Sequence, residues 1–265
     1  MTYKEKIKAH LKIYKQNNFK EIEDGEWKKN KKTYPHIFPQ NKWKLNLLTT
    51  YGCELEKYRE EKKIKNHTDF HHLNSSQAMC LNFFYPLIKE KELDIILKFI
   101  GFDNESINYE NVCFEKKSND KTCFDFFIET VSGKNIFFEI KYTEQKFGQA
   151  KNNESHRNKF NNIYNKKLKV IKEEFHTSDN FLKNYQVLRN LICIDKNSYV
   201  CFLYPRENNT IRKQSERVNS NFLKEEFLKN FKNITWEDLV SFTEKQAKNE
   251  NIKKQLKEFK DKYRV

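Results

Sequence analysis

The stretch that decides the fold is FDFFIETVSGKNIFFEIKYTEQKFG, which runs from Phe124 to Gly148. Two runs rich in Phe and Ile flank Ser132-Gly133, and this pattern predicts two strands joined by a hairpin turn. Both runs nevertheless contain charge, because Asp125 lies in the first and Glu139 and Lys141 lie in the second. Three ionisable side chains inside strands that otherwise resemble protein core require a chemical reason.

The spacing of these charges places them together. Side chains alternate across a strand, so Glu139 and Lys141 share one face. Asp125 and Glu139 each lie seven residues from Ser132, so a hairpin centred there sets them opposite one another. Two buried carboxylates side by side are unfavourable unless a cation balances them. A cross-strand ion pair of Lys141 with Glu139 or Asp125 is one solution.

A divalent cation is the other solution. The two carboxylates and the main-chain carbonyl of Ile140 are the hard oxygen ligands that Mg²⁺ prefers, with Mn²⁺ as a substitute. Lys141 would then lie beside the water that attacks a substrate, where it can orient that water or stabilise a developing phosphate charge. These are the groups that phosphodiester hydrolysis needs, and the hairpin context favours this interpretation over a simple ion pair.

The same residues resemble a known signature. Asp125, followed after 13 residues by Glu139-Ile140-Lys141, is similar to the motif of the PD-(D/E)XK nuclease superfamily. The resemblance covers roughly residues 70–205, and the stretches LNSSQAMCLNFFYPL, YQVLRN and FLYPREN look like a bacterial group of restriction-endonuclease-like proteins. It implies that Asp125 and Glu139 bind Mg²⁺ and that Lys141 assists the attacking water. Phe124 departs from the family, which usually has Pro before the Asp.

The resemblance also suggests supporting residues. Many members add an acid or amide from the helix before the hairpin, and Gln77 is the first candidate for a catalytic role of this kind, with Glu115 on the preceding strand second. A glutamine on the helix behind the hairpin meets the site in some branches, which suggests Gln186. The candidates for contact with DNA are Lys146, Arg157, Gln186 and Arg189. A solvated helix face explains the helical positions equally well.

Composition supports a polyanionic partner. The chain has 265 residues and a formal net charge of +14, which is typical of proteins that bind nucleic acid. The bias toward Lys, Asn, Ile and Phe that AT-rich genomes produce is the alternative explanation. Five glycines and the absence of a phosphate-binding glycine loop or a Rossmann fingerprint argue against a self-contained ATPase or dehydrogenase.

The cysteines and the N-terminus indicate a compartment. None of the six cysteines forms a CxxC pair, so a thiolate metal site or a disulfide framework is not expected. No apolar signal core and no membrane-spanning run is evident in the sequence. We therefore expect a reduced, cytoplasmic protein that does not associate with membranes.

The period of the apolar residues predicts an α/β fold. Helices are expected from Asn74 or Ser75 to Pro86 and over 89–101, 153–175 and 179–194, strands over 111–117, 123–131, 135–142 and 198–205, and a helical tail from Asn221. This order indicates a restriction-endonuclease-like core, a central mixed β-sheet flanked by helices, with helical N- and C-terminal additions. The expected divisions are a basic helical region 1–66, a nuclease core 67–210 and a helical region 211–265.

The function expected from the sequence is a Mg²⁺-dependent endodeoxyribonuclease, either a type II-like restriction endonuclease or an anti-phage defence nuclease. A homodimer would suit the cutting of two strands, and a methyltransferase or another defence-system partner encoded nearby would fit this role. Two alternatives stay open. One is a nuclease subunit of a larger defence or repair complex, and the other is a non-catalytic nucleic-acid-binding protein of the same fold.

Overall fold

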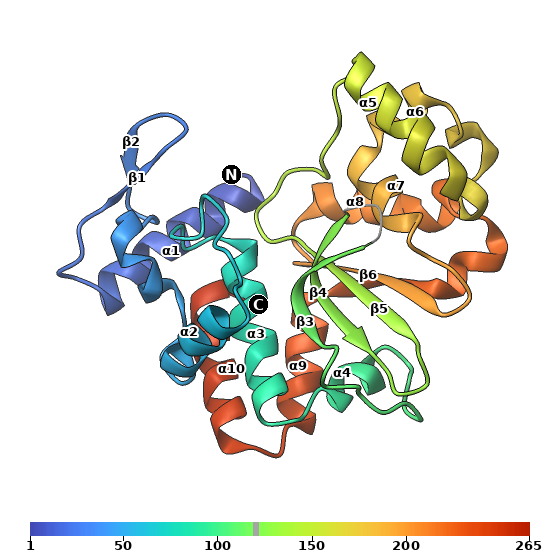
Figure 1. Cartoon of the computed structure of the whole chain (residues 1–265). Coiled ribbons are helices and arrows are strands. Elements are labelled where there is room, and N and C mark those ends of the chain that lie inside the picture. Colours follow the sequence, from blue (N-terminus) through green and yellow to red (C-terminus); the bar gives the residue numbers. More distant parts are fainter. Residues whose placement is uncertain (119–121) are drawn as a thin grey trace. The chain divides into compact units, whose positions relative to one another are not determined.

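A computed structural model describes residues 1–118 and 122–265 of the chain (Figure 1). The chain forms two compact units. We call residues 104–235 the sheet unit, and residues 1–103 together with 236–265 the helical unit. The expected division into 1–66, 67–210 and 211–265 groups the chain differently, and it remains a prediction.

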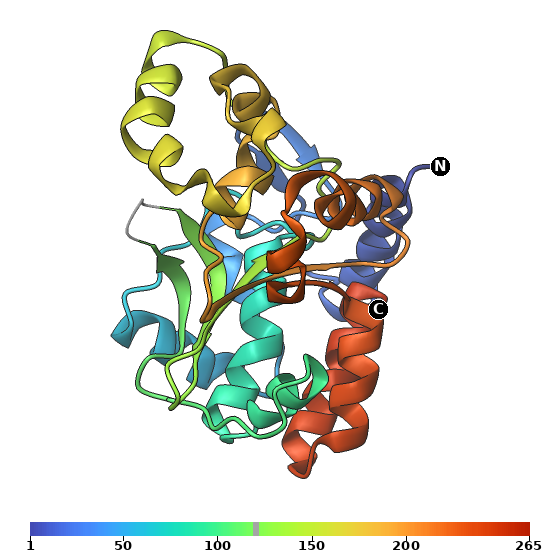
Figure 2. The same ribbon diagram turned by 90° about the vertical axis from the view of Figure 1, so that its right-hand side faces the viewer.

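The sheet unit contains a five-stranded mixed sheet (Figures 1 and 2). Its strands, in spatial as well as chain order, are β3 (Cys113–Lys117), β4 (Cys123–Glu129), β5 (Asn135–Ile140), β6 (Ser198–Tyr204) and β7 (Phe231–Thr235). The first three pair antiparallel, whereas β6 is parallel to β5 and β7 is parallel to β6. The predicted α/β class with a mixed central sheet is confirmed.

The hairpin of β4 and β5 forms in the predicted register. Phe127 pairs with Phe137, and the turn between the strands contains Gly133, whose φ of 84° favours glycine. Aromatic side chains from these strands are buried on both faces of the sheet, including Phe126 and Phe138 on the face opposite Phe127. A strand with two buried faces is typical of the interior of a sheet, so a charge on it is costly unless it is partnered.

Shorter helices than predicted cover the face of the sheet that carries Phe127 and Phe137. The core on this face takes residues from α6 (Ser178–Lys183), α7 (Tyr185–Leu191) and α8 (Asn209–Arg217), whereas α5 (Glu154–Lys159) has no buried residue and lies away from the sheet (Figure 1). The prediction of a single helix over 153–175 was wrong. After α5 the chain continues as a π turn and two short 3₁₀ turns (Phe160–Tyr164, Asn165–Val170 and Glu173–Phe175). The two 3₁₀ turns are separated at Ile171, which is extended and forms a bridge with Leu223.

The tail expected to be helical from Asn221 contains a strand. Residues Phe231–Thr235 form β7 and complete the sheet beside β6. Phe231 and Ile234 are buried, but the segment FKNIT is short and lacks strict alternation, so its period did not reveal a strand. Similarly, the helix expected over 179–194 is divided at Asn184, whose backbone is not helical.

The helical unit contains most of the remaining elements: α1 (Tyr3–Asn18), β1 (Gly25–Trp27), β2 (Lys32–Tyr34), α2 (Gly52–Glu61), α3 (Ser76–Lys89), α4 (Asp94–Phe99), α9 (Trp236–Gln246), α10 (Glu250–Tyr263) and a 3₁₀ segment (Gln40–Asn46). Ser75 caps α3 as predicted, since its hydroxyl accepts from the Ala78 N–H at 3.3 Å. No helix of the described residues is both long and apolar enough to cross a membrane.

Helix α3 continues through Pro86, which was expected to end or kink it. Proline cannot donate to the carbonyl four residues earlier, which is that of Asn82. The Asn82 carbonyl instead accepts from Gln255 Nε2 on α10 at 2.9 Å. A side chain from the other end of the sequence therefore replaces the bond that proline removes, and the helix runs on to Lys89.

A buried lysine joins the same network. Lys262 on α10 is 1% exposed, and its ammonium donates to the backbone and side-chain oxygens of Asn46 at 2.5 and 2.6 Å. No carboxylate forms an ion pair with it in the described part of the chain. Burial therefore lowers the pKa of Lys262 well below the ordinary lysine value.

Candidate metal-dependent active site

The three charged residues of the hairpin converge in the sheet unit. Asp125 lies on β4, Glu139 near the end of β5, and Lys141 just beyond β5. The ammonium of Lys141 forms an ion pair with Glu139 Oε1, and both side chains are buried. The Ile140 N–H donates to Asp125 Oδ2 at 2.6 Å, so the Asp125 carboxylate reaches across to β5.

The backbone is irregular beside this cluster. The ladder of β3 and β4 is interrupted where Glu115 faces Asp125, with regular pairs on either side of that position. Glu115 adopts a φ of 55°, a left-handed conformation that costs a non-glycine residue about 1–2 kcal/mol. Such strain concentrates at functional sites, and here it falls next to the candidate metal ligand.

Burial and neighbouring charges shift the pKa of Asp125 and that of Lys141. Burial raises the pKa of Asp125, and the negative charge of Glu139 raises it further, while Lys141 and the Ile140 N–H oppose the shift without cancelling it. Burial also acts against the charge of Lys141, yet Glu139, Glu144 and Asp125 together raise the pKa of that ammonium. In this cluster the single positive charge of Lys141 therefore faces more than one carboxylate.

This charge balance fits a divalent cation. The donor atoms are carboxylate oxygens of Asp125 and Glu139, to which the predicted carbonyl of Ile140 would be added, and hard oxygens are what Mg²⁺ binds. A second positive charge would remove the repulsion that raises the pKa of Asp125. Within residues 1–118 and 122–265 no group of three or more His, Cys, Asp or Glu side chains is arranged around a metal position, so the fit depends on these two carboxylates.

Helix α7 supports Glu139 with two amides. Gln186 Nε2 donates to Glu139 Oε1 at 2.7 Å, and Asn190 Nδ2 donates to Glu139 Oε2 at 2.9 Å. Asn190 is fully buried and was not identified from the sequence. Its position four residues after Gln186, on the same helix face, was the available signal. The two bonds fix the orientation of the Glu139 carboxylate.

The loop after β5 is held against α7 and α8. Gly148 and Gln186 exchange two hydrogen bonds, from the Gly148 N–H to Gln186 Oε1 at 2.7 Å and from the Gln186 N–H to the Gly148 carbonyl at 2.9 Å. Asn208 Nδ2 donates to the carbonyls of Tyr142 and Glu144 at 3.1 and 2.9 Å. The residues that follow Lys141 are therefore pre-organised.

The remaining candidates lie elsewhere. The guanidinium of Arg189 stacks on Tyr185, 5.2 Å from the ring centroid. Lys146 and Arg157 are exposed, and neither forms a hydrogen bond or ion pair with the charged cluster in the described part of the chain. They remain predicted DNA contacts.

Gln77 belongs to the helical unit. It is buried on α3, where its Oε1 accepts from the His67 N–H at 2.8 Å and its Nε2 donates to the Lys65 carbonyl at 2.9 Å. These bonds support the segment that precedes α3. A catalytic role for Gln77 remains a prediction.

Comparison with known proteins agrees with this geometry. Comparisons with curated proteins and with solved structures gave no match. The model of one protein family, described as "Restriction Endonuclease associating with ARP", matches residues 8–264. This match spans nearly the whole chain, including β4, β5 and α7, and it confirms the resemblance to restriction endonucleases seen in the hairpin. The chain therefore belongs to the family of restriction endonucleases that associate with ARP.

Proposed function

We propose that this protein is a Mg²⁺-dependent endodeoxyribonuclease that hydrolyses phosphodiester bonds of DNA. The observation that carries the proposal is the cluster of Asp125, Glu139 and Lys141, in which two converging carboxylates share one lysine on buried strands. Family membership supports a nuclease. The net charge of +14 supports a polyanionic substrate.

Asp125 and Glu139 would hold the ion, together with the carbonyl of Ile140. When bound, Mg²⁺ supplies positive charge that polarises the phosphoryl group and makes the attacking water more acidic. Lys141, kept protonated by its neighbours, would orient that water and stabilise charge that develops on the phosphate. Gln186 and Asn190 would keep the Glu139 carboxylate in one orientation throughout the reaction.

Association with a partner is favoured by the family description, which speaks of association with ARP. We therefore place the nuclease in a complex in which another protein contributes specificity, in restriction or another defence against foreign DNA. A stand-alone type II-like enzyme, acting as a homodimer beside a methyltransferase, is the second form of the proposal. A non-catalytic binding protein is disfavoured, because pure binding does not require two carboxylates and a lysine gathered on the strands of the sheet interior.

The first experiment is plasmid cleavage. The purified protein is incubated with unmethylated plasmid and Mg²⁺, beside samples with EDTA and with the Lys141→Ala variant. Discrete fragments that disappear in both controls would establish a sequence-specific nuclease, and nicking or smearing lost in both would establish a nuclease whose specificity comes from a partner. DNA binding that persists in EDTA and in Lys141→Ala, without any cleavage, would overturn the assignment.

Replacing Asn190 by Leu should weaken the binding of Mg²⁺ at the candidate active site. The substitution removes the donor to Glu139 Oε2, and losing such an outer-shell bond typically costs about 10- to 100-fold in metal affinity or activity. We expect the Mg²⁺ concentration for half-maximal cleavage to rise by about that factor, as measured by metal titration. Asn158→Leu, at an exposed position of α5, is the control. An unchanged titration in Asn190→Leu would show that this bond does not serve the metal site.

A further inference from the structure

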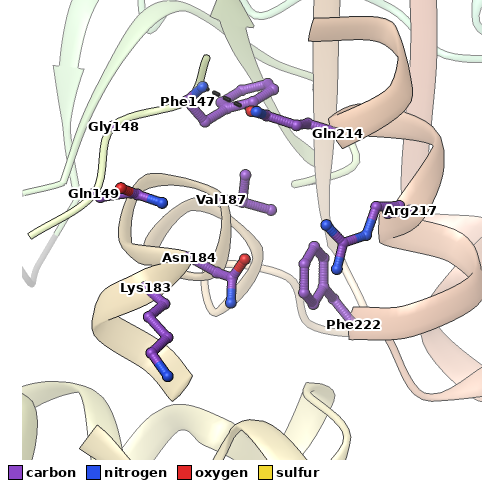
Figure 3. Close-up of a pocket in the computed structure, with 9 residues that line it drawn as sticks. All are labelled: Phe147, Gly148, Gln149, Lys183, Asn184, Val187, Gln214, Arg217 and Phe222. Carbon is purple, nitrogen blue, oxygen red and sulfur yellow. Dashed lines mark hydrogen bonds between the residues drawn. The ribbon is translucent and has the colours of Figure 1, made fainter. Parts of the chain in front are cut away.

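A small pocket lies next to the candidate active site in the sheet unit (Figure 3). It has a volume of about 110 Å³ and is lined by residues of the loop after β5, of α6 to α8 and of the following turn: Phe147, Gly148, Gln149, Lys183, Asn184, Val187, Gln214, Arg217 and Phe222. Two hydrogen bonds through Gln186 connect its lining residue Gly148 to Glu139, since Gln186 accepts from the Gly148 N–H and donates to Glu139.

The charge of the pocket is positive. Among the described residues, Lys183 and Arg217 are the only ionisable side chains that line it, and no carboxylate does. Both side chains are exposed, and neither takes part in an ion pair with any described residue. The Arg217 guanidinium stacks near Phe222, 5.6 Å from the ring centroid, and faces the pocket (Figure 3). Two cations without carboxylate partners favour an anionic ligand.

Hydrogen bonds hold the residues that line the pocket in position. Gln214 Oε1 accepts from the Phe147 N–H at 2.9 Å, as the dashed line in Figure 3 marks. The Ala150 N–H donates to the Leu182 carbonyl at 3.1 Å, which holds the end of the loop against α6. A ligand would therefore meet a pre-organised surface, and the cost of ordering the loop is avoided on binding.

We propose that this pocket binds one backbone phosphate of the nucleic acid strand, beside the phosphodiester that is cleaved. This inference rests on the proposed nuclease function and adds a substrate contact to it. The volume is well below the roughly 300 Å³ at which pockets for whole small molecules begin, so a single small group fits rather than a nucleotide. Arg217 and Lys183 supply the positive charge, while the amides of Gln149 and Asn184 supply further donors.

Binding to DNA without cleavage tests the proposal. A fluorescent duplex is titrated with protein in EDTA over a series of NaCl concentrations, using the wild-type chain, Arg217→Gln and Lys213→Gln. Lys213 is exposed on the same helix and does not line the pocket, so its variant removes an equal charge. We expect Arg217→Gln to weaken binding about tenfold at low salt and to reduce the salt slope by about one, while Lys213→Gln changes the slope by much less.

The outcomes separate the pocket from the nuclease function. Equal slopes for Arg217→Gln and Lys213→Gln would overturn the pocket assignment, whether or not the wild-type protein cuts DNA. A loss of slope in Arg217→Gln alone supports the pocket, even if the wild-type protein fails to cut with Mg²⁺. In a second arm inorganic phosphate is titrated by calorimetry. Saturable binding that Arg217→Gln abolishes, with no change in the DNA slope, would identify free phosphate as the ligand and overturn the strand contact.

Discussion

A double variant, Glu139→Gln with Lys141→Met, is expected to lose Mg²⁺-dependent DNA cleavage by about 10³-fold or more. The substitutions remove one of the two candidate metal carboxylates and the ammonium that pairs with it. Neither replacement carries charge, so the remaining Asp125 has no partner with which to hold a divalent ion. Cleavage is measured as the rate of supercoiled plasmid loss at saturating Mg²⁺.

The double variant is more informative than Lys141→Met alone. Removing only the lysine leaves Glu139 buried without its cation, which typically costs about 3–5 kcal/mol of stability. Replacing both partners leaves no unpaired charge at this position, so the unfolding free energy should change by less than in Lys141→Met. Urea unfolding of both variants checks this order. Full cleavage by a folded double variant would place the active site elsewhere in the chain.

A second large effect is expected from Lys262, which is buried and has no carboxylate partner among the described residues. Burial lowers its folded-state pKa, so between that lowered pKa and the ordinary lysine pKa of 10.5 the unfolded chain binds a proton that the folded chain does not. Because the unfolded state binds more protons, the unfolding free energy rises with pH in this window, by up to about 1.4 kcal/mol per pH unit. Stability is correspondingly lost as the pH falls from 10.5 toward the lowered pKa.

The slope should disappear in Lys262→Met, which has no proton to exchange. All three tryptophans, Trp27, Trp43 and Trp236, belong to the helical unit, so their fluorescence during urea unfolding reports on the unit that contains Lys262. Lys257→Met, exposed on the same helix, is the control and should retain the wild-type slope. If Lys262→Met keeps the same dependence on pH, another group is responsible for it.

The sequence was most informative where local spacing determines structure. Hairpin symmetry about Ser132 was enough to bring Asp125 and Glu139 together, because the register of a two-strand hairpin follows from its turn. The alternation of side chains likewise placed Lys141 beside Glu139. The PD-(D/E)XK resemblance depended on the same few residues, and the family match over residues 8–264 agrees with it.

Features that depend on contacts between distant segments could not be predicted from the sequence. Asn190 supports Glu139 from 51 positions away, and a helix face alone does not show which polar residue meets a strand. The strand β7 forms because β6 offers an edge, not because FKNIT has a strong strand pattern. Helix α3 survives Pro86 only because Gln255 supplies the missing donor. In the last two cases tertiary contacts overrode a local tendency.

The division of the chain has a consequence for its synthesis. The sheet unit is one continuous segment, whereas the helical unit combines residues 1–103 with residues 236–265. During synthesis the helical unit is therefore started before the sheet unit and completed after it. Until α10 emerges, Asn46 and Asn82 lack the bonds that they form with Lys262, Tyr263 and Gln255. The sheet unit, with its candidate active site, has all of its own residues earlier. Co-translational folding would then let the sheet unit form before the helical unit is complete.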